Sequence, residues 1–442
     1  MNMVDIILKK RDGGRLSEEE IIFFIKGYTE GSIPDYQASA ILMAIYFTGM
    51  NKEETYQLTK AMKNSGEVID LSSIKGIKVD KHSTGGVGDK TTLVVGPLAA
   101  ACGVPVAKMS GRGLGFTGGT VDKMESIPGF KTSIEADAFI ELVNRVGLSV
   151  IGQTAHIAPA DKKLYALRDV TGTIDNLSLI TSSIMSKKLA SGSDAIVLDV
   201  KCGNGAFMEN IEDATKLGQL MVDIGTTDGK KTIAVITDMS QPLGRAVGNS
   251  NEVIEAIETL KGRGPEDITE LSLTLAGIMI FAGGKASSME KGHIMAKEVM
   301  DNGKALEKLK LFIEGQGGNS NVIEDYALFL QYKEKVDVLA SEDGFVWAIS
   351  ARSIGLASQH SGAGRATKED LIDLSAGIYI HKKVGDMVVK GEILASVYGM
   401  DREKIEKGAK EAKKAFEISQ KKPEKQMLII KILDVDNIQK SV

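Results

Sequence analysis

The sequence is poor in cysteine, in long apolar runs and in net charge. Only Cys102 and Cys202 occur among the 442 residues, each in an apolar or glycine-rich stretch, so neither a disulfide framework nor a cysteine metal site is indicated. No apolar stretch approaches the length of a membrane span, and residues 1–14 lack the uninterrupted apolar core of a signal peptide. We therefore expect a cytoplasmic protein with no membrane partner.

The charge balance excludes another class of function. The formal net charge is −5, and charged residues make up 26 % of the chain, which is near the average for globular proteins. A dedicated nucleic-acid binder carries a basic stripe, so we expect no nucleic-acid partner. Any anion that this protein binds must be held by groups gathered locally.

The length of the chain and its apolar content of 43 % favour two or three domains. Residues 1–66 show helical patterns alone: a capping box begins at Ser17, Pro34 starts a second helix and Asn51 caps a third. After this segment, short β-branched runs alternate with helical stretches, which is typical of a parallel sheet with crossover helices. The expected strands cover residues 77–80, 104–107, 150–152, 195–200 and 232–237.

One interval interrupts the alternation. Residues 161–170 and 177–190 are two helical patterns that follow one another without an intervening strand. We infer that this helical pair leaves the sheet and returns to the N-terminal helices. Two domains joined by several crossings have a cleft between them, and such clefts are frequent small-molecule sites.

The predicted fold class is α/β, with a small all-helical lobe, a large α/β lobe around a mainly parallel central sheet, and a C-terminal α+β subdomain. Residues 384–394, in that subdomain, resemble half of a biotinyl or lipoyl carrier barrel. No lysine there has the Met-Lys-Met setting that such carriers modify, which favours a structural role. The expected limits are 1–69 and 160–192 for the helical lobe, 70–159 and 193–336 for the α/β lobe, and 337–442 for the subdomain.

A glycine-rich run follows the first expected strand. From Lys81 to Thr92 it can wrap successive backbone N–H groups around an anion, with charge from Lys81 and hydroxyl donors from Ser83 and Thr92. The run is not a P-loop, because an extra residue separates Gly88 from Lys90, and it is not a Gly-x-Gly-x-x-Gly dinucleotide turn. Taken alone, such a run is a tight connection about as often as it is a ligand site.

A second glycine-rich run, from Lys108 to Thr120, changes this balance. It also follows a strand, and it again offers lysine, hydroxyls and bare backbone. Ligands of open α/β sheets bind at the carboxyl ends of the strands, so two such loops at neighbouring strand ends converge on one tetrahedral anion. Phosphate is the leading ligand.

The departing helical pair carries a third set of polar residues. Ser183 and Lys187 lie four positions apart and therefore share a helix face. Without the glycine-rich runs, a solvated surface with a buried hydroxyl would be the better interpretation. The set consists of Tyr165, Arg168, Asp169, Ser183 and Lys187.

Six runs resemble the thymidine and pyrimidine-nucleoside phosphorylase family, in the right order and over nearly the whole chain. The resemblance implies a homodimer of subunits whose two lobes close over the substrate, with inorganic phosphate as co-substrate and no organic cofactor. The runs are KHSTGGVGD (81–89), SGRGLG (110–115), TGGT (117–120), APADK (158–162), GNGAF (203–207) and GAGRAT (362–367).

By matching positions, the resemblance also implies a role for individual residues. The catalytic residues are His82, Arg168 and Lys187, and Phe116 stands where many relatives carry a histidine, so no histidine acts there. The phosphate ligands are Lys81, His82, Ser83, Thr92, Lys108, Met109, Ser110 and Thr120, and the base and sugar fall to His82, Tyr165, Arg168, Ser183, Lys187 and Lys108.

Some relatives also carry a monovalent cation. Position 90, often threonine in relatives, is a lysine in this chain, which weighs against the ion. The candidate potassium site consists of Gly88, Lys90, Leu243, Ala246 and Glu255.

The reaction implied is reversible phosphorolysis of uridine, thymidine and deoxyuridine to a free base and α-D-ribose or 2-deoxyribose 1-phosphate, by direct displacement with inversion. Phosphate is already a nucleophile at neutral pH, so the protein must only hold it in line with C1′ and stabilise charge on the leaving base. Arg168 and Lys187 suit that charge, and His82 suits a shared proton, although a histidine at a strand end is also often structural. Thymidine-restricted relatives carry methionine in place of Lys108, so the lysine is expected to allow a 2′-hydroxyl.

Two alternatives stay open at this point. A phosphoribosyltransferase of similar architecture, such as the one acting on anthranilate, binds a pyrophosphate–Mg²⁺ group and should show an acidic pair, which the substrate loops lack. A nucleoside- or phosphate-binding regulator would have kept the fold and lost turnover, yet every catalytic position that can be matched is present.

Overall fold

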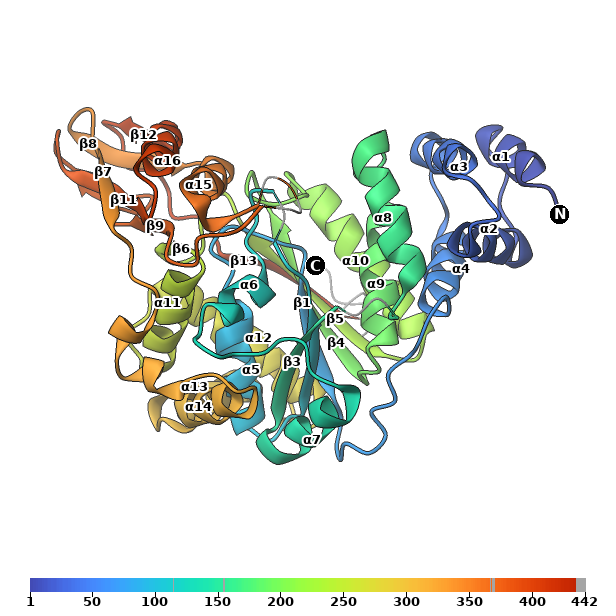
Figure 1. Cartoon of the computed structure of the whole chain (residues 1–442), viewed down its shortest axis with the longest axis horizontal. Helices are drawn as coiled ribbons and strands as arrows, with labels where there is room; N and C mark the ends of the chain where they lie inside the picture. The colour runs from blue at the N-terminus through green and yellow to red at the C-terminus, as the bar shows by residue number, and fades with distance from the viewer. Residues whose placement is uncertain (114, 154–155, 366, 368–369, 435–442) are drawn as a thin grey trace.

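The structure is a computed structural model that describes residues 1–113, 115–153, 156–365, 367 and 370–434. Leu114 and Ala366, in two of the runs that carry the family resemblance, and residues 435–442 of the predicted C-terminal subdomain lie outside the described residues. The described chain has an α/β fold with additional helices at its N-terminus and a mixed C-terminal part (Figure 1), which confirms the predicted fold class.

Three N-terminal helices begin where the sequence predicts, at Ser17, Pro34 and Asn51, and the helix Met3–Arg11 precedes them. Ser17 and Asn51 each form a reciprocal capping box, with Glu20 and Glu54 respectively. The helical pair that follows β3 packs on these helices, because Ala160, Leu164 and Leu179 belong to the same hydrophobic core. The helices are α1 (Met3–Arg11), α2 (Glu18–Glu30), α3 (Asp35–Thr48), α4 (Lys52–Lys63), α8 (Pro159–Thr171) and α9 (Leu177–Ala190).

The central strands form two hydrogen-bonded groups rather than one. β1 (Val79–Ser83), β4 (Ala195–Cys202) and β5 (Lys231–Asp238) pair in parallel, while β2 (Val106–Ser110) and β3 (Leu148–Gly152) form a separate parallel pair beside β1. The Nζ of Lys108, on β2, donates to the backbone oxygen of Lys81 on β1. In a continuous sheet, a backbone oxygen such as that of Lys81 accepts a hydrogen bond from an N–H group of the neighbouring strand. Here it accepts one from the Lys108 side chain.

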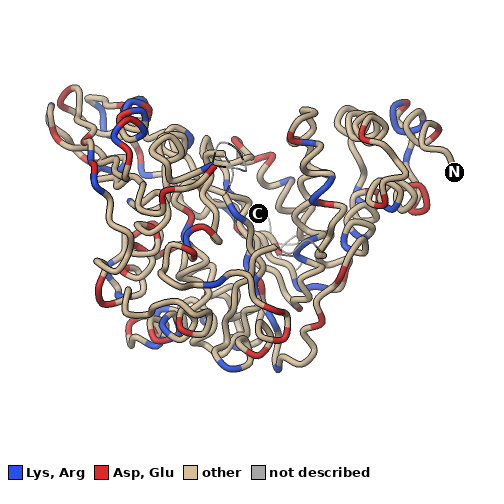
Figure 2. Tube along the Cα trace, viewed as in Figure 1, with Lys and Arg blue, Asp and Glu red and all other residues tan. Residues whose placement is uncertain are grey.

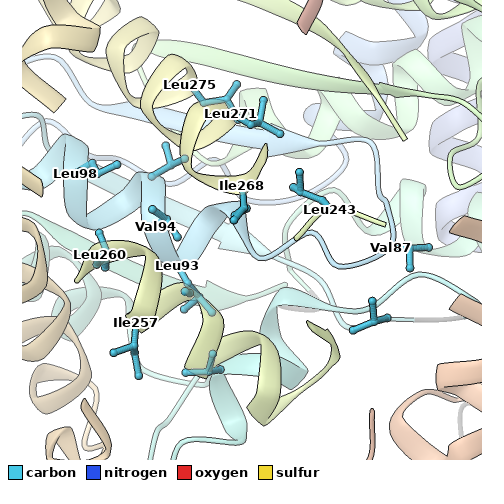
Figure 3. Close-up of a cluster of buried hydrophobic side chains, with 14 of the residues drawn as sticks. Val87, Leu93, Val94, Leu98, Leu243, Ile257, Leu260, Ile268, Leu271 and Leu275 are labelled. Atoms are coloured by element: carbon cyan, nitrogen blue, oxygen red, sulfur yellow. The ribbon is translucent and has the colours of Figure 1, made fainter. Parts of the chain in front are cut away.

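Helices cover the strands, and the helix α5 (Thr91–Ala101) is the most deeply buried of them. Its residues Leu93, Val94 and Leu98 pack against α11 and α12 (Figure 3), in the largest hydrophobic core of the chain. Because α5 starts at the end of the first glycine-rich run, this packing fixes the position of Thr92. The other helices are α6 (Thr120–Glu125), α7 (Ala136–Val146), α10 (Ile211–Thr227), α11 (Ser250–Leu260), α12 (Glu266–Ala282), α13 (Met289–Asp301) and α14 (Lys304–Gly315).

Two antiparallel sheets and two helices make up most of the C-terminal part. One sheet has the order β6-β9-β11-β7 and the other β10-β8-β12. The strands are β6 (Ala246–Gly248), β7 (Glu334–Leu339), β8 (Gly344–Ile349), β9 (Gly377–Ile380), β10 (Met387–Val388), β11 (Ile393–Gly399) and β12 (Phe416–Ser419), and the helices are α15 (Ala351–Ser358) and α16 (Arg402–Lys414).

Three contacts cross the predicted domain limits. β13 (Ile429–Leu433) pairs antiparallel with β5, so a strand from the predicted C-terminal subdomain completes the central sheet. β6 pairs with β9, so a segment of the predicted α/β lobe joins the C-terminal sheet. The second half of α9, with Met185 and Leu189, packs in a core shared with β4, β5 and α10. In each case the position of the segment depends on a partner that is distant in the sequence, so the local sequence pattern does not predict it.

Candidate functional site

Lys81 is the central residue of β1, at the start of the first glycine-rich run. Its side chain is buried, and its Nζ donates to Oγ1 of Thr91 at 2.5 Å and lies 3.4 Å from Oδ2 of Asp199. Asp199 also pairs with Lys201 at 2.7 Å. The Lys81 ammonium is thus held at the floor of the loop by a buried carboxylate, which fixes a positive charge beneath any bound anion.

The loop above Lys81 needs glycine for its shape. Gly85 and Gly88 have positive φ values of 101° and 73°, a region that residues with a side chain rarely adopt. The loop ends at α5, which has Thr92 in its first turn, and the N–H groups of a helix N-terminus favour a nearby anion. Asp89 is held as an anion: burial raises its pKa, but Lys81, Lys201 and Lys123 lower it well below the usual range.

The second glycine-rich run folds around Asp122. The carboxylate of Asp122 accepts hydrogen bonds from Arg112 at 3.0 Å, from the backbone N–H of Gly113 at 2.8 Å and from Arg365 at 2.9 Å. The run ends at α6, where Thr120 is the first helical residue. Ser110 ends β2, so both predicted hydroxyl ligands lie at the ends of this loop.

Lys108 lies between β1 and β2 and is 4 % exposed. Its Nζ donates to the Lys81 backbone oxygen and lies 3.5 Å from Oδ1 of Asp80. Burial lowers the pKa of Lys108 to about 7. The Asp80 carboxylate raises the pKa, whereas the positive charges of Lys188 and Lys81 lower it further. The side chain therefore changes charge near neutral pH.

The helix α9 is fixed to these strand ends by Lys188. Its Nζ donates to Oδ2 of Asp80 at 2.8 Å and to the backbone oxygen of Met109 at 2.9 Å. Met109, a predicted phosphate ligand, has its side chain buried in the hydrophobic cluster with Phe139 and Ile151.

Lys187, the residue before Lys188, has a different environment. Its Nζ donates to Oδ2 of Asp161, on α8, and to Oγ of Ser183 at 3.1 Å. The predicted sharing of a helix face by Ser183 and Lys187 is confirmed. Lys187 remains 21 % exposed, so its ammonium is both positioned and accessible.

Arg168, a predicted ligand of the base, is held by backbone oxygens. Its Nε, Nη1 and Nη2 donate to the backbone oxygens of Thr173, Leu179 and Ile174 at 3.0, 3.0 and 2.6 Å, and the residue is 3 % exposed. Burial lowers its pKa to about 10, which leaves it charged at neutral pH. Three of its five N–H groups are used in this way, two on the connection between α8 and α9 and one on the first turn of α9. One turn earlier on α8, burial raises the pKa of Tyr165, which keeps the phenol neutral.

His82 lies where the two groups of residues meet. The half-buried ring has a pKa well below its ordinary value, first because of burial and then because of Lys188, Lys108, Lys187 and Lys81. Two of these lysines belong to the strands and two to α9, so His82 lies within electrostatic range of both groups. At neutral pH it is an uncharged imidazole, with one N–H donor and one acceptor.

Comparisons with known proteins show which family the chain belongs to. Three family models cover most of the chain: the glycosyl transferase family helical bundle domain (residues 4–66), the glycosyl transferase family a/b domain (75–306) and the pyrimidine nucleoside phosphorylase C-terminal domain (345–419). The pyrimidine-nucleoside phosphorylase of Geobacillus stearothermophilus is 58 % identical over 406 residues, covering 92 % of this chain and 94 % of that protein. The chain belongs to the pyrimidine-nucleoside phosphorylase family.

Further relatives extend this result. The pyrimidine-nucleoside phosphorylase of Bacillus subtilis (strain 168) is 59 % identical over 406 residues, covering 92 % of this chain and 94 % of the relative, and that of Staphylococcus haemolyticus (strain JCSC1435) is 58 % identical over 418 residues, covering 95 % and 96 %. A solved structure of anthranilate phosphoribosyltransferase from Thermus thermophilus has a TM-score of 0.57 and 19 % identity, covering 70 % of this chain and 98 % of that one. This last similarity concerns the fold alone.

In this member of the pyrimidine-nucleoside phosphorylase family, sequence reasoning assigned no role to the residues that hold the lysines. Asp80, Asp161 and Asp199 each contact a lysine of the site. A signal existed for Asp199 and Lys201, because two charged residues at alternate positions of an apolar strand share one face. No such signal marks Asp161, since an acidic residue in a first helical turn is expected for the helix dipole alone.

The family resemblance implies one metal site, the candidate potassium site. Across the described ranges, no group of three or more His, Cys, Asp or Glu side chains is arranged to hold a metal, and no helix is long and apolar enough to cross a membrane. Lysine and arginine are interspersed with aspartate and glutamate along the trace (Figure 2).

Proposed function

We propose that this enzyme catalyses the reversible phosphorolysis of pyrimidine nucleosides. The proposal rests on family membership and on one observation: His82 lies within range of the strand lysines Lys81 and Lys108 and of the helix lysines Lys187 and Lys188. An anion held by the first pair and a leaving group held by the second would meet beside this imidazole.

Phosphate would be bound at the strand ends by charge, hydroxyls and helix N-termini. Lys81 supplies the charge, and the ends of α5 and α6 supply backbone N–H groups. The hydroxyl donors are Ser83, Thr92, Ser110 and Thr120. No activated side-chain nucleophile is required, because the phosphate oxygen itself attacks C1′ of the sugar.

The leaving base would be stabilised mainly by Lys187. As the bond between C1′ and the base nitrogen breaks, its electron pair moves onto the base, and a nearby ammonium lowers the energy of that charge. Neutral His82 can donate its N–H to a base carbonyl, and Tyr165 and Ser183 offer further hydroxyls. Arg168 acts through the backbone it holds, and its remaining N–H groups suit a base carbonyl. A single displacement inverts C1′ and gives the α-configured sugar phosphate.

The substrates would be uridine, thymidine and deoxyuridine. Lys108 carries this part of the proposal, because an ammonium between the strands can compensate the desolvation of a 2′-hydroxyl. Its contacts with Asp80 and the Lys81 backbone place it beneath the anion loop.

The proposed assembly is a homodimer formed through the N-terminal helices. Large apolar side chains are exposed on α1, α2 and α3, and exposed apolar surface is typical of interaction sites. Replacing Phe47 by glutamate is expected to give monomers in light scattering, whereas Met427→Glu, at an exposed residue outside these helices, should leave the dimer intact. The exposed residues are Val4, Leu8, Ile22, Tyr36, Met43 and Phe47.

The direct test is product analysis with uridine, thymidine, cytidine and inosine, with and without phosphate and in the presence of EDTA. The proposal expects base release from the first two that requires phosphate and no divalent metal. Release that requires pyrophosphate and Mg²⁺ would favour a phosphoribosyltransferase. No release from any nucleoside would favour a binding protein.

A further inference from the structure

The ammonium group of Lys90 is enclosed by oxygen atoms contributed from another part of the chain. Its Nζ donates to the backbone oxygens of Leu243 at 3.0 Å and Ala246 at 2.8 Å, and to Oε2 of Glu255. An ammonium has three donors, and each has an acceptor here. Lys90 is 1 % exposed.

The acceptors around Lys90 are themselves fixed. The Glu255 carboxylate accepts the backbone N–H groups of Arg245 and Ala246, at 2.9 to 3.2 Å. Burial opposes the charge on Lys90, but Glu255 and Glu252 attract it, and the net effect raises its pKa. The carboxylate and the two carbonyl oxygens thus stabilise the charged ammonium.

This environment has the chemistry of a monovalent cation site. Two carbonyls and a carboxylate converge on one point, as they do around potassium, which has the charge and nearly the size of an ammonium group. The expected potassium ion does not fit together with Lys90, because the ion would use the same oxygens and lie in contact with a like charge. A Cβ at Gly244 would lie 2.9 Å from this Nζ, which shows how closely the loop surrounds it.

We propose that Lys90 is a built-in cation that replaces the potassium ion, so that this chain needs no monovalent cation for its stability or for phosphate binding. Lys90 immediately precedes α5, whose first turn carries Thr92, and Ala246 begins β6 of the C-terminal sheet. The ammonium thus joins the phosphate loop to the C-terminal part of the chain. The backbone bond from Leu243 to Val87 runs beside it.

The test compares two substitutions of Lys90, one that leaves a space for an ion and one that fills this space. Lys90→Thr removes the ammonium and leaves an oxygen-lined space, which potassium can enter. Lys90→Met removes the charge but fills the space with an apolar chain. Melting temperatures are measured in KCl and in tetramethylammonium chloride, whose cation is too large to enter.

The wild type is expected to melt at the same temperature in both salts. Lys90→Thr should melt at a lower temperature in tetramethylammonium chloride and recover by about 5 °C in saturating KCl, through binding to the folded state. Lys90→Met should be destabilised in both salts. Crystals soaked in Tl⁺, which scatters anomalously, should show a peak between Leu243, Ala246 and Glu255 in Lys90→Thr and none there in the wild type.

Potassium-dependent melting of the wild type, or Tl⁺ bound at these oxygens beside Lys90, would overturn the proposal, as would a Lys90→Thr variant that responds to potassium no more than Lys90→Met. If Lys90→Thr folds only in KCl, the proposal is supported. These measurements involve no turnover, so their failure is distinct from failure of the proposed function. One further arm rests on that function: the KM for phosphate of Lys90→Thr should fall about tenfold on adding KCl.

Discussion

Lys187 on α9 donates a hydrogen bond to Asp161 on α8, and Asp161 is almost completely buried. Oδ2 of Asp161 accepts this bond, while Oδ1 has no hydrogen-bond partner among the described residues. The Asp161 carboxylate on α8 therefore positions the Lys187 ammonium on α9. Its other oxygen, Oδ1, is a buried acceptor beside this contact. This pair makes the leaving-base account testable.

Lys187→Ala should lower kcat/KM by about 10² or more, because the ammonium stabilises charge that develops only in the transition state. Asp161→Asn keeps the size of the side chain and loosens the position of Lys187, so a loss of about tenfold is expected. Glu212→Gln, at an exposed carboxylate on α10, is the matched control. Steady-state kinetics at saturating phosphate measure all three, and a Lys187→Ala enzyme with unchanged kinetics would remove Lys187 from the site.

Arg168→Ala should destabilise the fold as well as reduce activity. The substitution leaves three backbone carbonyls without the donors they have now. We expect a loss of about 3 kcal/mol in the free energy of unfolding. Urea titration measures this value, and Lys187→Ala serves as the comparison. Equal stability of the two variants would show that the three carbonyl contacts are unimportant.

Lys108→Met should reduce uridine cleavage more than thymidine cleavage. The expected discrimination is about 1–3 kcal/mol, the cost of leaving one hydroxyl without its partner. Ratios of kcat/KM for uridine, deoxyuridine and thymidine measure this difference, and the pair uridine and deoxyuridine isolates the 2′-hydroxyl. If all three substrates lose the same factor, Lys108 acts on phosphate alone.

Lys108 should also make stability depend on pH. Its pKa is about 7 in the folded protein and near 10.5 when unfolded, so the unfolded state binds more protons between these values. The free energy of unfolding of the wild type should therefore rise relative to Lys108→Met above pH 7, by up to about 1.4 kcal/mol per pH unit. Denaturant titrations of both proteins at pH 7 and 9 measure the change. A constant difference would show that Lys108 keeps its ordinary pKa.

Closure of the helical lobe is predicted to turn on residues 66–76, 153–160 and 190–194, of which 154 and 155 lie outside the described residues. The three segments meet: the N–H of Glu67 donates to the oxygen of His156, and that of Ile69 to the oxygen of Ala190, both at 2.9 Å. Rotation about such a junction moves one lobe as a body. Scattering profiles with and without phosphate plus a nucleoside analogue should differ. Superimposable profiles would indicate a preformed site.

The parts of the fold that were predictable from sequence are those with a local cause. The capping boxes at Ser17 and Asn51 and the five apolar strands follow from hydrogen bonding and burial within a short segment. The glycine-rich runs likewise indicate a candidate anion site, because glycine is needed where the backbone itself surrounds a ligand.

The parts that sequence could not supply depend on distant partners. Arg168 binds carbonyls of a connection whose path is set by packing, and β13 finds its edge of the sheet only once β5 is in place. The Lys90 ammonium is another example, because its acceptors come from residues more than 150 positions away. A sequence shows which residues are charged, but it does not show which residues they contact.

The most direct test of the central claim is the fate of phosphate oxygen. With [¹⁸O₄]phosphate and uridine, the account predicts ribose 1-phosphate that keeps all four labelled oxygens, one of them bridging to C1′, with α configuration at that carbon in NMR spectra. Free ribose, an unlabelled bridging oxygen or a β-configured product would contradict direct displacement by the anion held at the ends of β1 and β2.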